Sequence, residues 1–283
     1  MKAHWTFTVL TVAVLSVVVP INAAGNPERL RGLFRELGSS DLTVKNRASQ
    51  GLLAYAETWV RQDIATMRKS LPVILAALDD DDSLVRIQAS AFFGMVGMFR
   101  RSDGMRILKD FVGDVLEHFE DPNSQVRANM VRCIAGLEPA PPPEAVEPFL
   151  KHLDDPSGEV RRMAVLGLLR AAPQSQRAVE AVAALLDKKE DSERRREILQ
   201  TLAFVKPMHP VLLAKVAEQL DEPNELLRFT TLRVLTEIGP PAAIAIHKIR
   251  EIANDPATGK DLRISAEAAL RAIEQRPPPK PRR

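Results

Sequence analysis

The sequence has little of several features on which protein classes depend. Its 283 residues include one cysteine, Cys133, so an internal disulfide framework and a cysteine-rich metal site are excluded. Aromatic residues make up 5%, which disfavours strands because strands draw on aromatic and β-branched side chains. The formal net charge of +2 is too small to indicate a nucleic-acid-binding protein. No Gly-rich phosphate loop, serine-nucleophile motif or His-Glu-x-x-His signature is present, so no catalytic, cofactor or metal site is predicted.

What the chain does contain favours packed helices. Hydrophobic residues make up 45% and charged residues 27%, which is typical of a folded protein with a full core. Alanine and leucine, both strong helix formers, are abundant. Cys133 falls at an apolar helical position and is interpreted as core filler.

The first 24 residues differ from the rest. Lys2 is the only lysine or arginine before Arg29, an apolar run covers residues 5–19, and small residues follow at Ala23 and Ala24. This order is typical of a secretory signal peptide, and the run is shorter than the roughly 20 residues of a membrane span. We therefore expect a mature protein in the periplasm or outside a bacterial cell, with no membrane insertion after cleavage; an uncleaved anchor is the alternative. The Pro-rich basic tail, residues 276–283, is expected to be disordered.

One short sequence motif recurs between residues 25 and 275. Residues 153–161 read LDDPSGEVR, residues 119–127 read FEDPNSQVR, and residues 220–228 read LDEPNELLR. Aligning the copies of this motif places one basic residue in each repeat unit, at intervals of 41, 41, 34, 33, 34 and 35 residues. A repeat of this length indicates stacked structural units. The aligned basic residues are Lys45, Arg86, Arg127, Arg161, Arg194, Arg228 and Arg263.

The positions around each basic residue, taken as offset 0, predict a helix. Apolar residues recur at offsets −1 and +7 and small or apolar residues at +3, which together form one face of an α-helix. Good N-cap residues recur at offset −4. The fifth unit is the exception, since Glu190, Glu193 and Thr201 break three of the columns. A second apolar helix precedes each cap, so each unit is predicted to be a helical hairpin.

The phrase Asp-Asp-Pro-x-x-x-Val-Arg between two amphipathic helices resembles the HEAT repeat, in particular the bacterial HEAT-like group. The resemblance covers roughly residues 27–275. It implies an all-α protein, an α-solenoid of about seven HEAT-type hairpins in a right-handed superhelix. The tetratricopeptide repeat has a similar length, but its Trp, Gly-Tyr and Ala-Phe-Pro signature is missing.

The arginines are expected to fall into two classes. Residues at offset 0 lie beside the apolar face, and the resemblance implies that they form a structural ladder with acidic residues of neighbouring turns. Arg161 and Arg228 are therefore expected to reach turn carboxylates. Residues near offsets +1, +5 and +9 should face outward on the concave side of the solenoid, either as an ordinary solvated face or as a basic stripe that binds a partner. The stripe would comprise Arg132, Arg162, Arg170, Arg195, Arg196 and Arg233.

These features predict a non-catalytic scaffold that binds a protein partner, with an acidic partner if the stripe is used. The apolar residues Ile87, Phe229 and Ile264 share offset +1 and offer a second contact surface. His118 and His152 hold equivalent places in successive first helices, and we interpret them as structural. The resemblance also includes bilin lyases and nucleic-acid-processing enzymes, which are the alternatives. The predicted signal peptide opposes the bilin-lyase alternative, which is a cytoplasmic activity. Export, the scarcity of aromatic residues for base stacking and the near-neutral charge oppose nucleic-acid processing.

Overall fold

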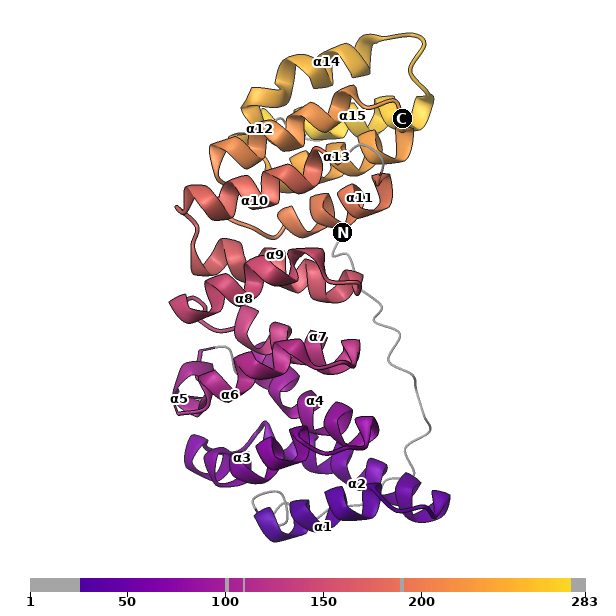
Figure 1. Cartoon of the computed structure of the whole chain (residues 1–283). Coiled ribbons are helices and arrows are strands. Elements are labelled where there is room, and N and C mark those ends of the chain that lie inside the picture. Colours follow the sequence, from indigo (N-terminus) through magenta and orange to yellow (C-terminus); the bar gives the residue numbers. More distant parts are fainter. Residues whose placement is uncertain (1–25, 100–101, 109, 189–190, 276–283) are drawn as a thin grey trace. The chain divides into compact units, whose positions relative to one another are not determined.

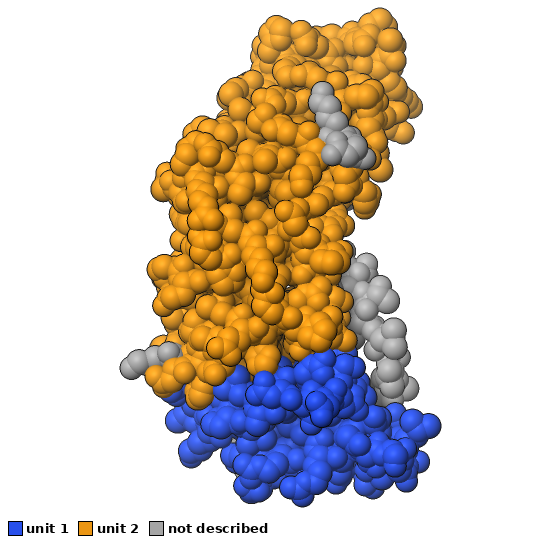
Figure 2. Space-filling view, in the orientation of Figure 1, with its two compact units in different colours: residues 1–88 blue, residues 89–283 orange. Residues whose placement is uncertain are grey.

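The computed structural model describes residues 26–99, 102–108, 110–188 and 191–275, and every regular element in these ranges is helical. The predicted signal peptide and the Pro-rich tail lie outside the described residues. The chain divides into two compact units, residues 1–88 and 89–283, which Figure 2 shows in different colours. The all-α solenoid class predicted from the repeats is confirmed.

Helical hairpins follow one another along the whole described chain (Figure 1). The first unit holds α1 (Pro27–Leu37), α2 (Leu42–Trp59), α3 (Ile64–Leu78) and the start of α4 (Ser83–Phe99). The second unit holds the rest of α4 and the following elements. These are α5 (Gly104–Leu108), α6 (Val112–Glu117), η2 (His118–Glu120), α7 (Ser124–Ala135), η3 (Pro143–Ala145), α8 (Val146–Lys151), η4 (His152–Asp154), α9 (Gly158–Ala171), α10 (Gln176–Leu186), α11 (Ser192–Leu202), α12 (Pro210–Glu218), η5 (Gln219–Asp221), α13 (Glu225–Ile238), η6 (Pro240–Ala245), α14 (Ile246–Asn254) and α15 (Lys260–Ile273).

The second helices of the repeats are α2, α4, α7, α9, α11, α13 and α15, and we number repeats 1 to 7 by them. In the second unit α7, α9, α11, α13 and α15 contact one another in succession, so they form one layer. The first helices form the other layer, in which α10 contacts α12 (Figure 1). The predicted number of seven hairpins is confirmed for the described residues.

The capping residues predicted from the sequence begin the second helices. Asp41 accepts a hydrogen bond of 2.7 Å from the N–H of Thr43, and Asn224 accepts one of 3.1 Å from the N–H of Leu227. Ser157 stands at the same place before α9, although its hydroxyl makes no capping bond. Side-chain acceptors at these positions satisfy N–H groups that have no partner inside the helix.

The fifth repeat begins one residue later than predicted. Asp191, not Glu190, caps α11 and accepts a hydrogen bond of 2.8 Å from the N–H of Arg194. Ile198 and Leu202, both 0% exposed, then occupy the core positions at offsets +3 and +7 from Arg195. The alignment on Arg194 is therefore wrong by one residue, and Arg195 is the residue at offset 0 in this repeat.

Candidate binding surface

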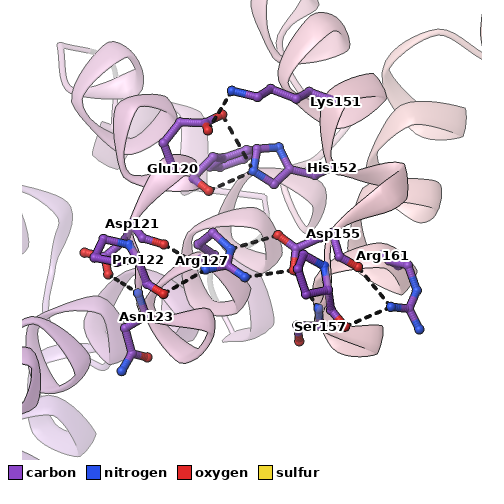
Figure 3. Close-up of polar contacts among 12 residues, drawn as sticks. Glu120, Asp121, Pro122, Asn123, Arg127, Lys151, His152, Asp155, Ser157 and Arg161 are labelled. Atoms are coloured by element: carbon purple, nitrogen blue, oxygen red, sulfur yellow. Dashed lines mark hydrogen bonds and ion pairs between the residues drawn. The ribbon is translucent and has the colours of Figure 1, made fainter.

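The ladder contacts of repeats 3 and 4 lie in the turns between their two helices (Figure 3). Arg127 Nη1 donates to the backbone oxygens of Asp121 and Pro122 of its own turn, at 2.8 and 3.2 Å. Its Nε and Nη2 donate to the two carboxylate oxygens of Asp155 in the next repeat, at 2.8 and 2.9 Å. These side chains are 12% and 5% exposed, so the bidentate pair is well shielded from water. Arg127 thus joins its own turn to the following repeat.

Asp155 is held in its ionised form by these contacts. Burial raises the pKa of Asp155, but the hydrogen bonds from Arg127 and from the N–H of Ser157 outweigh burial and leave the pKa lowered. The same bond to Asp155 raises the pKa of Arg127. Both shifts favour the charged pair.

Acid should weaken the fold through this carboxylate. The folded state lowers the pKa of Asp155, so the unfolded chain binds the proton more readily. The stabilisation is fully present above the unfolded value of about 3.9 and is lost as pH falls below it. Urea unfolding at pH 7, 4 and 3 should show a falling free energy of unfolding. Asp155→Asn should fall less steeply, and an unchanged slope in this variant would contradict the assignment.

Arg161 repeats the pattern with a different acceptor. Its Nη1 donates to the backbone oxygens of Asp155 and Pro156, at 2.9 and 3.0 Å, and its Nη2 donates to Glu197 at 2.7 Å. Glu197 lies on α11 rather than in a turn. The ladder between neighbouring repeats, implied by the HEAT resemblance, is therefore present here with a carboxylate supplied by the next second helix.

Arg195 extends the ladder, contrary to the prediction that it faces outward. Its side chain is 3% exposed, and its Nη1 lies 3.1 Å from Glu222 and 3.0 Å from Gln219 Oε1. The one-residue shift of α11 turns Arg195 toward the core side. Arg194, which is predicted to belong to the ladder, pairs with Asp154 in the turn of the preceding repeat and donates to the backbone oxygen of Leu153.

Arg228 does not reach a turn carboxylate, so that expectation is wrong. No hydrogen bond or ion pair joins its guanidinium to any residue in the described ranges, and its Nε is buried without an acceptor. Arg263 in the last repeat likewise has no partner within the described part of the chain. In unit 1 the ladder positions are engaged: Lys45 Nζ lies 3.1 Å from Asp82, and Arg86 Nη1 donates to the backbone oxygen of Asp80 at 2.9 Å.

Arg161 and its neighbour Arg162 should differ in their effect on stability. Arg161→Ala leaves Glu197, 17% exposed, without its cationic partner and should lower the free energy of unfolding by about 1–3 kcal/mol. Arg162 has no partner among the described residues, so Arg162→Ala should change stability by about 0.5 kcal/mol or less. Urea unfolding of both variants measures the difference. Equal losses would contradict the helical phase assigned to α9.

The outward-facing arginines are engaged to different degrees. Arg132 Nη1 donates to Asn129 at 3.0 Å, and its Nη2 pairs with Glu159 on α9. Burial, together with the positive charge of Arg162, lowers the pKa of Arg132. Of the predicted stripe residues, Arg132 is therefore already engaged by Asn129 and Glu159.

Of the remaining predicted stripe residues, only Arg233 is free. Arg170 Nη2 donates to the backbone oxygen of Leu137 at 2.7 Å, so it ties α9 to the end of repeat 3. Arg196 pairs with Glu193 one turn earlier on α11. Arg233 is exposed on α13 and has no partner in the described ranges. The structure thus leaves Arg162 and Arg233, on α9 and α13, as the unengaged members of the set.

Large apolar side chains are exposed on the same second helices. Leu226 and Phe229 on α13 are 57% and 41% exposed, and Ile264 on α15 is 50% exposed. Phe229 and Ile264 share offset +1 on helices that pack against each other, and Leu226 lies three residues before Phe229. We call these three residues the apolar patch. Ile87, which shares the offset, lies in unit 1 and is partly exposed.

The two histidines hold the equivalent places predicted for them, each opening a 3₁₀ turn, η2 or η4. His152 is 4% exposed, and its ring nitrogens lie 2.8 Å from the backbone oxygens of Pro148 and Phe119. The ring also meets that of Phe119 edge-on, with centroids 5.6 Å apart. His152 thus connects the first helix of repeat 4 to that of repeat 3, which is the structural role predicted for it.

Three further findings concern the described residues. Cys133 is fully buried, and burial raises the pKa of its thiol, in agreement with its interpretation as core filler. No group of three or more His, Cys, Asp or Glu side chains there is arranged to hold a metal ion. None of the helices described is both long and apolar enough to span a bilayer.

Residues 110–203, which span repeats 3 to 5, match the family model described as HEAT repeats. An archaeal HEAT-like repeats protein from Thermococcus onnurineus NA1 has a similar structure, with a TM-score of 0.54 at 14% identity over 88% of this chain and 97% of that one. A designed armadillo repeat protein aligns at 19% identity over 86% and 99% of the two chains, with a TM-score of 0.40. Another, in complex with the peptide (KR)4, aligns at 17% identity over 86% and 99%, with a TM-score of 0.41. No curated protein matches the chain.

Residues 110–203 are therefore similar to HEAT repeats, and the likeness to the archaeal protein shows a shared fold.

Proposed function

We propose that the chain is a non-catalytic scaffold that binds a protein partner on the second-helix face of repeats 4 to 7. The observation that carries this proposal is the apolar patch, Leu226, Phe229 and Ile264, each more than two-fifths exposed on neighbouring helices. Clustered apolar side chains on a protein surface mark interaction sites, because water contact with them is unfavourable. Solenoids present such surfaces along successive repeats.

The unengaged arginines favour an acidic partner. Arg233 lies four residues after Phe229 on α13, so the two side chains are neighbours on one helical face. Arg162 on α9 likewise has no partner among the described residues. A partner that places apolar side chains on the patch and carboxylates beside Arg162 and Arg233 satisfies both features. Arg195 is buried and is not part of this surface.

The test captures partners from the native cell envelope with the mature protein as bait. Phe229→Asp with Ile264→Asp should reduce capture of the wild-type partner at least about tenfold, as expected for loss of interface anchors. The matched control is Ile244→Asp, which alters a residue that is 63% exposed but lies in η6, outside the second helices. Thermal melts should be the same for all variants. Equal capture by the patch variant and the control would contradict the proposal.

The charged part of the surface is tested separately. Arg162→Glu with Arg233→Glu should weaken capture, and raised salt should weaken capture by the wild type as well, because exposed charges are screened. Undiminished capture by this variant would remove the acidic partner from the proposal and leave the apolar patch.

We also propose that the protein acts after export, with residues 1–24 as a cleaved signal peptide. The charged start, the short apolar run and the small residues at Ala23 and Ala24 support this. N-terminal sequencing of protein recovered from the cell envelope should find a start near Ala24 or Gly25. An intact Met1 in the envelope fraction would favour the uncleaved anchor, and recovery from the cytosol alone would contradict export.

A further inference from the structure

The ladder of the second unit stops at Arg228. Arg127 donates to Asp155, Arg161 to Glu197, and the Arg195 guanidinium lies 3.1 Å from Glu222. In each case the carboxylate belongs to the following repeat. Arg228, at the same position in repeat 6, faces repeat 7 and has none of these contacts. Nor does it donate to the backbone oxygens of its own turn, as Arg127 and Arg161 do.

The reason is an insertion of two residues in the last turn. In repeat 4, Asp155 and Pro156 precede the cap Ser157 directly. In repeat 7, Asp255 and Pro256 are followed by Ala257 and Thr258 before the cap Gly259. Asp255 therefore lies eight residues before Arg263, whereas Asp155 lies six before Arg161. The ladder position itself, six residues before Arg263, is occupied by Ala257, which offers no carboxylate.

The hydrogen bonds of the two aspartates show the consequence. Both accept a bond from the N–H two residues later, Asp155 from Ser157 at 2.7 Å and Asp255 from Ala257 at 2.9 Å. Asp155 gives both of its oxygens to Arg127 as well. The second oxygen of Asp255 instead accepts the hydroxyl of Thr258 at 3.3 Å. Asp255 thus holds its own turn and does not extend to Arg228.

A cavity of about 350 Å³ opens beside the Arg228 side chain. Its lining includes Pro223, Lys248, Ile252, Asp255 and Thr258. The corresponding cavity between repeats 3 and 4, of about 370 Å³, is lined by Arg127 and Asp155, which are paired with each other. The two cavities differ in that the arginine of the first has no carboxylate.

We propose that this cavity binds an acidic side chain of a peptide segment, whose carboxylate accepts hydrogen bonds from the Nη1 and Nη2 groups of Arg228, since its Nε is buried. An arginine fork matches a carboxylate with two parallel hydrogen bonds, and the same molecule shows that geometry at Arg127. The site lies at the starts of the second helices and is separate from the apolar patch, so it stands independently of the proposed function.

The charges around the cavity define the ligand further. Asp221 is paired with Lys248, and Glu222 lies 3.1 Å from Arg195. Glu251, close to His247, and Asp255 remain as negative groups in the lining. They disfavour a dianion such as phosphate and weaken binding of a monoanion. A single carboxylate with millimolar affinity is therefore the expected ligand.

The test follows the Nε–Hε signal of Arg228 in ¹⁵N-labelled full-length protein, assigned by its loss in Arg228→Gln. The probes are the blocked peptides acetyl-Gly-Glu-Gly-amide and acetyl-Gly-Gln-Gly-amide, which differ in one charged group. The glutamate peptide should shift the signal saturably, with at least about fivefold tighter binding than the glutamine peptide. The Nε–Hε signal of Arg127, whose guanidinium is already paired, should stay unchanged.

Two variants test whether the response of Arg228 comes from the peptide or from an internal carboxylate. Deleting Ala257 and Thr258 restores the spacing of repeat 4, so Asp255 should pair with Arg228 and the response to the glutamate peptide should vanish. Asp255→Asn should leave the response in place. The proposal is overturned if both peptides act alike, or if Arg127 responds as Arg228 does. It is also overturned if Asp255→Asn alone moves the Arg228 signal as the peptide does, since Arg228 would then use an internal partner.

Discussion

Replacing Arg195 with alanine should lower the free energy of unfolding by about 3–5 kcal/mol, because one partner of a buried ion pair is removed. The side chain is 3% exposed and lies 3.1 Å from Glu222, which is itself only 16% exposed. Without Arg195 the carboxylate stays shielded from water with no cation beside it, and Gln219 Oε1 loses a donor. Urea unfolding followed by circular dichroism measures the loss.

The neighbouring arginines are the matched controls. Arg194 pairs with Asp154, which is 66% exposed, so Arg194→Ala should cost about 1 kcal/mol. Arg196 pairs with Glu193 one turn away, and Arg196→Ala should cost about 0.5 kcal/mol or less. Three consecutive arginines with three different costs would establish the phase of α11. A larger loss in Arg194→Ala than in Arg195→Ala would favour the original alignment.

Most of the fold could be predicted from the sequence because its signals are local. N-cap side chains act on N–H groups two or three residues away, as Asp41 and Asn224 do. The apolar positions recur with the helical period, so Val160, Ala164 and Leu168, all 0% exposed, could be placed on one face of α9. Several units with the same pattern reinforce one another, and this repetition gave the hairpins and their order.

The error in repeat 5 arose where the local signals were weakest. Three arginines in a row offer three candidates for offset 0, and the turn before them lacks the Asp-Pro pair. Aligning on Arg195 would have placed Asp191 at the cap and Ile198 and Leu202 at the core positions. Those residues fit their columns better than Glu190 and Thr201 do. The apolar residues of repeat 5 therefore favour the alignment on Arg195, whereas the basic residues alone do not distinguish it from the alignment on Arg194.

The partners of the outward arginines could not be predicted in the same way. Arg170 binds a backbone oxygen at the end of the preceding repeat, and Arg132 meets Glu159 on the following second helix. Both contacts depend on how successive repeats pack, which helical periodicity alone does not specify. The sequence does indicate that Arg228 lacks a carboxylate partner. Asp255 and Pro256 lie two residues farther from Arg263 than Asp155 and Pro156 lie from Arg161.

A charge in the core should show how far the repeats depend on one another. Leu168 on α9 and Leu202 on α11 are both 0% exposed at offset +7, and replacing either with aspartate buries a carboxylate with no partner. Each substitution should cost more than about 4 kcal/mol, which is at the upper end for single changes. Because each repeat is stabilised mainly by its neighbours, the loss should lower the stability of adjacent repeats as well. Urea unfolding should therefore shift as a whole, with no separate early transition.

Thr201, the residue first assigned to the core position of repeat 5, provides the control. It is 6% exposed, and its hydroxyl donates to the backbone oxygen of Glu197 at 2.9 Å. Thr201→Val keeps the shape and removes that one donor, so it should change the free energy of unfolding by about 1 kcal/mol or less. Thr201→Asp should cost less than Leu202→Asp, because Leu202 lies deeper in the contact with the neighbouring helices. If Thr201→Asp proved the more damaging of the two, α11 would be rotated by one residue, and Arg195 would return from the ladder to the outward face.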